Sequence, residues 1–366
     1  MTSFGVQVEG VRKSLGGREV LHGVSFALES GKTGAIVGPS GSGKSTLLNV
    51  ISGLLEADDG RVSIDGSVVG ERANGVARVN VPPSQRNVGY VFQDYLLFPH
   101  MTVFENVAYG LRARHASDST VRERVAASLE KVGLRELRDK KPPQISGGQM
   151  QRVALARAIV LEPKLLLLDE PLSALDRSTR ESLRVELRRT FDELATTAVY
   201  VTHDLDEAFF LGQSVGILHS GELSFFESKS DMLGRMSRPT AEFLGFNLVR
   251  ARLLGVNGSG AVLHIEGWDP VTVPLVYESA HRVGQDVVVA VPPESVKVSP
   301  EASGQGVRAR IEELYEFKDS VQLVVGYGAS RLVCQVPNLE FRQLSLKRGD
   351  PVKLALESAL LLSDSN

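Results

Sequence analysis

A short stretch of small residues, GPSGSGKST at positions 38 to 46, limits most strongly what this chain can fold into. It matches the spacing G-x-x-x-x-G-K-[ST], with Gly38, Gly43, Lys44 and Ser45 at the fixed positions. A strand-like run precedes it and an apolar helical run follows, which is the context that this motif requires. Glycines let backbone amides approach a ligand closely, and the amides together with a helix N-terminus attract phosphate. The stretch therefore predicts a loop that wraps a triphosphate, with Lys44 on the β and γ phosphates and Ser45 on Mg²⁺.

Two carboxylates follow a second apolar run, Leu165 to Leu168. The run is apolar on both faces, as in a buried parallel strand, so Asp169 and Glu170 lie just past its end. Beside a phosphate loop, Asp169 is a candidate Mg²⁺ ligand, and Glu170 is placed to polarise an attacking water. The alternative is a pair of acids that merely opens a loop before Pro171.

Two further polar residues also follow predicted strands. Gln93 comes after the strand that ends at Phe92, and His203 comes after the strand that ends at Thr202. In open α/β sheets, ligands bind outside the carboxyl ends of the strands. We therefore expect the phosphate loop, Gln93, Asp169 and His203 to share one edge, and we favour a catalytic role for His203 over a structural one.

A fourth motif, Ser146-Gly147-Gly148-Gln149, opens a predicted helix, 149–160. Ser146 with Gln149 has the form of a capping box. Two glycines in a first helical turn cost about 1 kcal/mol each relative to alanine, which capping alone does not explain. They are explained if this helix end also approaches a phosphate.

The chain changes character near Ser237, which predicts two domains. Residues 1–236 alternate β-branched strands with amphipathic helices, including 121–132 and 179–194, so they predict an α/β domain with a mostly parallel sheet. Residues 237–366 contain short alternating strands between glycine-rich turns, which predict an all-β barrel region. Within it, Val249 to Arg252 recurs as Val307 to Arg310, and residues 283–287 are echoed at 348–352, which indicates two copies of one β unit.

Composition excludes several classes of protein. A net charge of −3 and a pI near 6.2 argue against a nucleic-acid binder. The single cysteine, Cys334, forbids an internal disulfide and fits a reducing cytosol. The longest apolar run is far shorter than the ~20 residues of a membrane span, so we expect a cytosolic chain whose membrane role comes through partners.

The motifs occur in the order found in the ATP-binding cassette family, which the chain resembles over residues 4–235. The resemblance implies a P-loop NTPase domain with a helical subdomain at about 94–160, which uses ATP and Mg²⁺. Two nucleotide domains would dock head to tail, as a homodimer or a paired cassette, so that each ATP lies between one phosphate loop and the partner's Ser146 motif. Gln93, with Asp94 to His100 behind it, resembles the segment that senses the γ phosphate and contacts the two membrane permease subunits. The resemblance also implies that Asp176 communicates across the dimer.

The expected site residues fall into three groups. Those expected to be catalytic are Glu170, His203 and Gln93. Those expected to bind the metal are Ser45, Gln93 and Asp169. Those expected to contact the nucleotide are Gly38, Pro39, Ser40, Gly41, Ser42, Gly43, Lys44, Ser45, Thr46, Ser146, Gly147, Gly148, Gln149 and Asp176.

One position departs from the family. Family members usually carry an adenine-stacking aromatic where this chain has Leu15. Leucine offers dispersion contact without ring stacking, so we expect weaker discrimination between bases.

The C-terminal region resembles the OB-like TOBE domain on ATPase subunits of binding-protein-dependent importers. The long segment before Pro82-Pro83 most resembles the molybdate or tungstate class, with sulfate, ferric ion, polyamine and sugar as alternatives. The chain is then expected on the cytoplasmic side of the cell membrane, coupled through the permease to an extracytoplasmic binding protein. Arg252, Arg308 and Arg310 are either a regulator site or solvated surface charges, and we favour the second.

Rival classes are a soluble cassette ATPase that acts on ribosomes or DNA, and a phosphate-loop kinase. The first would show a long heptad insertion between Lys44 and Ser146 or a second cassette, and neither is present. The second gives no reason for the Ser146 motif.

Overall fold

The computed structural model of the chain divides into two compact units, residues 1–229 and 230–366. It describes residues 3–173, 177–228, 238–257, 260–268, 270–274, 282–301, 306–328 and 330–362. The boundary expected at 236/237 lies seven residues beyond the division at 229/230, and both fall in 229–237, outside the described residues.

A six-stranded sheet forms the centre of the first unit. Its strands, in spatial order, are β11 (Glu222–Ser228), β10 (Ser214–His219), β3 (Thr33–Val37), β9 (Thr197–Thr202), β8 (Leu165–Asp169) and β7 (Val88–Val91). All neighbouring pairs are parallel except β11 with β10. Every residue of β3, β8 and β9 is buried, as expected for parallel strands covered on both faces. Because β3, β8, β9 and β7 run the same way, their carboxyl ends meet at one edge of the sheet.

A second, antiparallel sheet packs against the helix that follows the phosphate loop. Its strands, in order, are β2 (Arg18–Glu29), β1 (Phe4–Leu15), β4 (Asp59–Ile64), β5 (Ser67–Ala73) and β6 (Val76–Asn80). Helix α1 (Lys44–Ser52) contacts β2 of this sheet and β8 and β9 of the first. Its Leu47, Leu48 and Ile51 are completely buried in the shared core, so the helix that follows the phosphate loop is firmly held.

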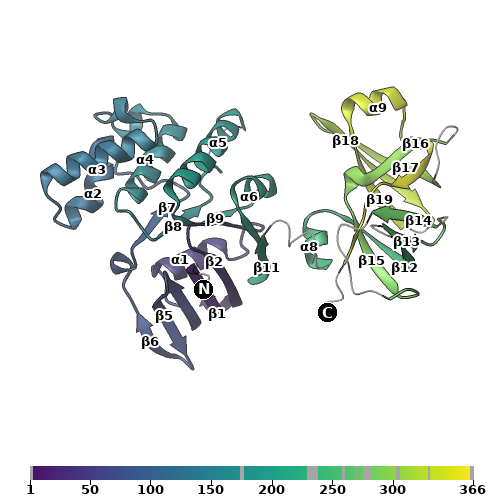
Figure 1. The fold of residues 1–366 in the computed structure, drawn as a ribbon. Coiled ribbons are helices and arrows are strands. Elements are labelled where there is room, and N and C mark those ends of the chain that lie inside the picture. Colours follow the sequence, from purple (N-terminus) through teal and green to yellow (C-terminus); the bar gives the residue numbers. More distant parts are fainter. Residues whose placement is uncertain are drawn as a thin grey trace. The chain divides into compact units, whose positions relative to one another are not determined.

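Three helices pack against one another beside the parallel sheet (Figure 1). They are α2 (Val103–Ala113), α3 (Asp118–Lys131) and α4 (Gly147–Ile159). Capping boxes start two of them, Thr102 with Glu105 at α2 and Ser146 with Gln149 at α4. The remaining helices of the unit are α5 (Arg177–Leu194), α6 (Leu205–Leu211) and the 3₁₀ turns Pro83–Gln85, Arg135–Leu137 and Pro142–Gln144.

The second unit contains two five-stranded antiparallel sheets with one pairing scheme. The first has the order β14 (Val271–Pro274), β13 (Gly260–His264), β12 (Asn247–Asn257), β15 (Asp286–Val291), β21 (Leu360–Leu361). The second has the order β19 (Ser330–Pro337), β18 (Ser320–Tyr327), β17 (Val307–Glu316), β20 (Pro351–Leu356), β16 (Val296–Pro300). Among its described residues, the unit also contains helices α8 (Arg238–Phe243) and α9 (Asn338–Leu344) and the 3₁₀ turn Pro293–Ser295.

The two sheets also repeat their register. Ala251 pairs with Val287 in the first sheet, and Ala309 pairs with Val352 in the second. Both long strands carry a bulge at the same place, after Leu253 and after Ile311. Because the fifth strand of each sheet comes from the other half of the unit, we propose two copies of one β unit that exchange their last strands.

The predicted fold class is confirmed, with one difference: the region expected to be all-β also carries α8 and α9. No helix among the described residues is long and apolar enough to cross a membrane. Arg252 pairs with Asp286 and Arg308 with Glu301 on the surface, which supports the solvated reading of these arginines.

Candidate functional site

The phosphate loop occupies the turn between β3 and α1, at the carboxyl edge of the parallel sheet. Gly41 and Gly43 have φ values of +80° and +105°, in the left-handed region that glycine favours. Gly43 starts α1 with no side-chain cap, so the first amides of the helix receive no bond from its N-cap residue. An added Cβ at Gly38 would lie 2.1 Å from the backbone oxygen of Leu218. The loop therefore has the backbone that close approach to phosphate requires.

Two buried polar groups of the loop have the chemistry to bind a phosphate. The Ser42 hydroxyl is buried and has no hydrogen-bond partner. The Lys44 side chain is only 4% exposed, and its Nζ donates to the carbonyl oxygens of Gly38 (2.9 Å) and Pro39 (3.1 Å). An unpartnered buried hydroxyl is costly, and an ammonium that binds carbonyl oxygens can bind phosphate oxygens instead, so both groups fit a bound phosphate.

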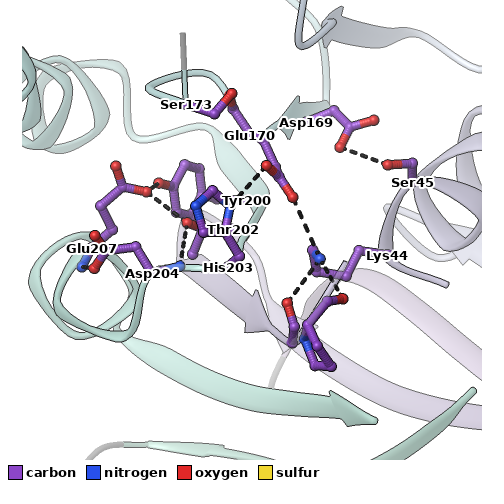
Figure 2. Close-up of polar contacts among 12 residues, drawn as sticks. Lys44, Ser45, Asp169, Glu170, Ser173, Tyr200, Thr202, His203, Asp204 and Glu207 are labelled. Carbon is purple, nitrogen blue, oxygen red and sulfur yellow. Dashed lines mark hydrogen bonds and ion pairs between the residues drawn. The ribbon is translucent and has the colours of Figure 1, made fainter. Parts of the chain in front are cut away.

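Asp169 ends β8 and faces the start of α1. Ser45 Oγ donates to its Oδ1 at 2.9 Å, so the two oxygens expected to bind Mg²⁺ lie together (Figure 2). Tyr90 OH lies 3.5 Å from Oδ2. Burial raises the pKa of Asp169 and the charge of Glu170 adds to this, while Ser45, Lys44 and Tyr90 oppose the shift. A hard cation with oxygen ligands fits this pair, because it would restore the charge balance of a buried carboxylate.

Both carboxylate oxygens of Glu170 are engaged (Figure 2). Oε1 lies 3.4 Å from Lys44 Nζ, and Oε2 lies 2.9 Å from His203 Nδ1. The backbone of Glu170 is left-handed, with φ of +42°, and its carbonyl accepts bonds from Ser173 N and Ser173 Oγ. A non-glycine residue held in this region is costly and is typical of functional sites.

A buried polar cluster that was not predicted from sequence lies beneath His203. Glu207, on α6, accepts hydrogen bonds from the hydroxyls of Tyr200 and Thr202. The three side chains lie together in Figure 2. Polar residues on the buried strand 198–202 were a signal that could have revealed it, because buried polar groups need partners. Tyr90 was missed for the same reason.

Among the described residues, no hydrogen bond or ion pair joins the remaining expected residues to this cluster. Gln93 is exposed two residues beyond β7. Ser146 and Gln149 bond to each other at the start of α4, and among the described residues no hydrogen bond or ion pair joins them to the phosphate loop. Leu15 is 42% exposed and ends β1 opposite Arg18. Asp176 lies outside the described residues.

Replacing Gly38 by alanine tests whether the phosphate loop requires a residue without a side chain at this position. The new Cβ would collide with the Leu218 carbonyl, so we expect a loss of about 1–3 kcal/mol in stability and a loss of nucleotide affinity. Thermal unfolding and binding of a fluorescent ATP analogue measure both. Gly41→Ala is the matched control, because it strains the backbone but its Cβ has nothing within 4 Å. Equal losses of stability in the two variants would contradict the steric role of Gly38.

Comparisons with known proteins also indicate a nucleotide-binding site of the ABC type. Residues 21–173 match the family model described as ABC transporter. The chain is 39% identical over 354 residues to the sulfate/thiosulfate import ATP-binding protein CysA of Ralstonia nicotianae, covering 94% of this chain and 92% of that protein. It is 38% identical over 320 residues to the molybdate/tungstate import ATP-binding protein WtpC of Thermococcus kodakarensis, covering 85% and 91%.

A solved structure matches the first unit. It is the dimeric ATP-binding cassette MJ0796 in a post-hydrolysis state bound to ADP and Pi. The identity is 34% and the TM-score 0.52, over 61% of this chain and 98% of the other.

Proposed function

The chain belongs to the ABC transporter family as one of its ATPases, and on this basis we propose that it is the ATP-hydrolysing subunit of an importer for an inorganic oxyanion. The observation that carries the proposal is the cluster of Lys44, Ser45, Asp169, Glu170 and His203 at one edge of the sheet. No other cluster of the described residues joins a phosphate loop, a candidate metal pair and a candidate base.

Each residue of the cluster has a distinct proposed role. Lys44 leaves Glu170 to bind the β and γ phosphates, and Ser45 with Asp169 holds Mg²⁺, which would neutralise phosphate charge when bound. Glu170 then polarises the attacking water, and His203 fixes the carboxylate through its 2.9 Å contact. Gln93, exposed at the end of the neighbouring strand, senses the γ phosphate and reports to the permease.

The partner is a second ATPase chain docked head to tail. The solved cassette that matches the first unit is described as dimeric and bound to ADP and Pi, which supports a pair of cassettes. The Ser146 motif supports the same proposal, because among the described residues the side chains of Ser146 and Gln149 make only their reciprocal capping bonds. The pair would associate with two permease subunits at the cytoplasmic face of the membrane and work with an extracytoplasmic binding protein.

The cargo is proposed to be sulfate or thiosulfate. The molybdate reading of the segment before Pro82 gives way to this alternative, because the sulfate/thiosulfate relative matches over nearly the whole chain. Loop length is a weaker guide than identity over both units, since loops tolerate insertions.

Uptake measurements test the proposed cargo. Deleting the gene in its own host is expected to reduce radiolabelled sulfate uptake to background, because the sulfate importer then lacks its ATPase. Molybdate uptake should persist, because its importer uses a different ATPase. A plasmid copy should restore sulfate uptake, and a Lys44→Ala copy should not, since that variant lacks the proposed phosphate ligand. Intact sulfate uptake with lost molybdate uptake would return the assignment to the molybdate class.

A further inference from the structure

The buried cluster beneath His203 is more polar than a packing role requires. Glu207 is only 4% exposed, and its Oε2 accepts the hydroxyls of Tyr200 and Thr202, the latter at 2.6 Å. Within the part of the chain that the structure describes, no cationic side chain pairs with Glu207. A buried carboxylate without a cation costs free energy, and apolar residues of similar volume would fill the same space more cheaply.

Thr202 connects this cluster to His203. Its Oγ1 donates to Glu207 and accepts a bond from the backbone amide of Asp204 at 3.0 Å. Asp204 in turn caps α6, with Oδ1 accepting the amide of Glu207 at 3.0 Å. His203 therefore lies between two residues whose positions are both fixed through Glu207 (Figure 2).

The same short segment also contacts the rest of the site through its backbone. The carbonyl of Thr202 accepts the amide of Gly38 in the phosphate loop at 3.3 Å. The carbonyl of Val201 accepts the amide of Glu170 at 3.0 Å. A shift at the end of β9 would thus move the imidazole of His203 relative to both the base and the phosphates.

The hydroxyls that donate to Glu207 keep their protons, so they can hold the end of β9 in place at any physiological pH. Burial raises the pKa of Tyr200 well above its usual value, and the charge of Glu207 adds to the shift. The hydroxyl of Tyr200 therefore stays a donor at any physiological pH. The hydroxyl of Thr202 does not titrate either, so the two donors to Glu207 are permanent.

We propose that Thr202 and Glu207 are positioning residues, whose hydrogen bond fixes His203 against Glu170 for hydrolysis. This inference rests on the proposed function, because it assigns a purpose to the 2.9 Å contact between His203 Nδ1 and Glu170 Oε2. The two residues touch neither substrate nor metal in this scheme. They act only through the geometry of His203.

The experiment combines turnover with a direct view of the histidine. The full chain contains seven histidines, so the ring signal of His203 can be assigned by NMR in histidine-labelled protein with the variant His203→Gln. Thr202→Val removes the hydroxyl and keeps the shape. We expect it to shift the His203 signal and to lower kcat by about 10-fold to 100-fold while the Kd of ATP stays within about 2-fold.

Three further variants keep the test decisive. Thr202→Ser retains the hydroxyl and should restore both the signal and kcat. Thr190→Val is the matched control, since it removes a buried threonine hydroxyl bonded to Glu186 O in α5 and should leave the His203 signal in place. If Thr202→Val does not fold, Glu207→Gln, which weakens the same bond, is expected to shift the signal in the same direction.

The outcomes separate the two proposals. An unchanged His203 signal and normal kcat in Thr202→Val would overturn the positioning role, even if the unmodified protein hydrolyses ATP. An equal fall in kcat in Thr190→Val would overturn it as well. If the unmodified protein shows no ATPase activity in its assembled complex, the proposed function fails, whereas the NMR comparison still reports on the position of His203.

Discussion

Replacing Glu170 by glutamine is expected to lower ATP hydrolysis by about 10²-fold to 10⁴-fold, because an amide cannot accept a proton from the attacking water. The substitution preserves the size of the side chain and leaves Lys44, the proposed phosphate ligand, unchanged. Nucleotide affinity should therefore be retained. Since hydrolysis is the proposed step that reopens the dimer, ATP should accumulate in a closed pair of chains. Phosphate release and size-exclusion chromatography with light scattering measure the two effects.

The control for this variant is Glu162→Gln. Glu162 is an exposed acid whose partner, Arg124, lies on α3, away from the sheet edge that carries the site. It should leave turnover and the nucleotide-free oligomeric state as they are in the parent. Normal turnover by Glu170→Gln would show that Glu170 is not the general base. A variant that stays monomeric at saturating ATP and Mg²⁺ would contradict the proposed dimer.

The parallel strands of the first unit were predictable from sequence. The runs at 34–37 and 165–168 are apolar on both faces, and the run at 198–202 is rich in β-branched residues. Strands β3, β8 and β9 begin and end within one residue of these runs. Burial on both faces leaves little room for other structure, so continuous apolar runs are a strong signal. The long helices were also predicted, because their apolar residues recur with the helical period.

The antiparallel sheet of the same unit was not predicted. Strands β1 and β2 are each 12 residues long, but their pairing contains four register shifts. Each bulge reverses the alternation of buried and exposed positions, so the period of two disappears from the sequence. Helix α2 was missed although its capping box, Thr102 with Glu105, was present as a signal.

Most residues of the candidate site could be predicted, because they come directly after predicted strands in the sequence. The structure brings Lys44, Ser45, Asp169, Glu170 and His203 together as expected, because parallel strands deliver their carboxyl ends to one edge. The polar residues of β9 signal that buried hydrogen-bond partners exist beneath His203, but which residue they bond to could not be predicted. Tyr200, Thr202 and Glu207 meet only because α6 folds back on β9, and nothing in a single strand reports that tertiary contact.

Chains with defects in different motifs are expected to restore each other's activity, which is the strongest consequence of a shared ATP site. Lys44→Ala removes the phosphate ligand, and Ser146→Arg places a bulky charge at the helix end proposed to face the partner's ATP. Each variant alone should lose hydrolysis by roughly 10²-fold or more, since a preorganised charge or donor is removed from the reacting phosphate. In a head-to-tail pair of the two variants, one site combines both defects and the other combines an intact phosphate loop with an intact Ser146 motif. A mixture in equal amounts should therefore regain up to about a quarter of the parent activity, because half of the pairs are mixed and each holds one intact site of two.

The matched control mixes Lys44→Ala with Glu170→Gln, two defects that lie on the same side of the proposed interface. Every site in every pair then carries one of them, so no recovery is expected, although both variants still associate. Phosphate release after exchange of subunits, with pair composition checked by mass spectrometry, provides the comparison. Recovery of hydrolysis in the control mixture as well would contradict the shared site, because it would show that mixed pairs regain activity without combining residues of two chains in one site. Absence of recovery in both mixtures, with mixed pairs present, would mean that Ser146 serves its own chain as a helix cap and that the pocket is not divided between two copies.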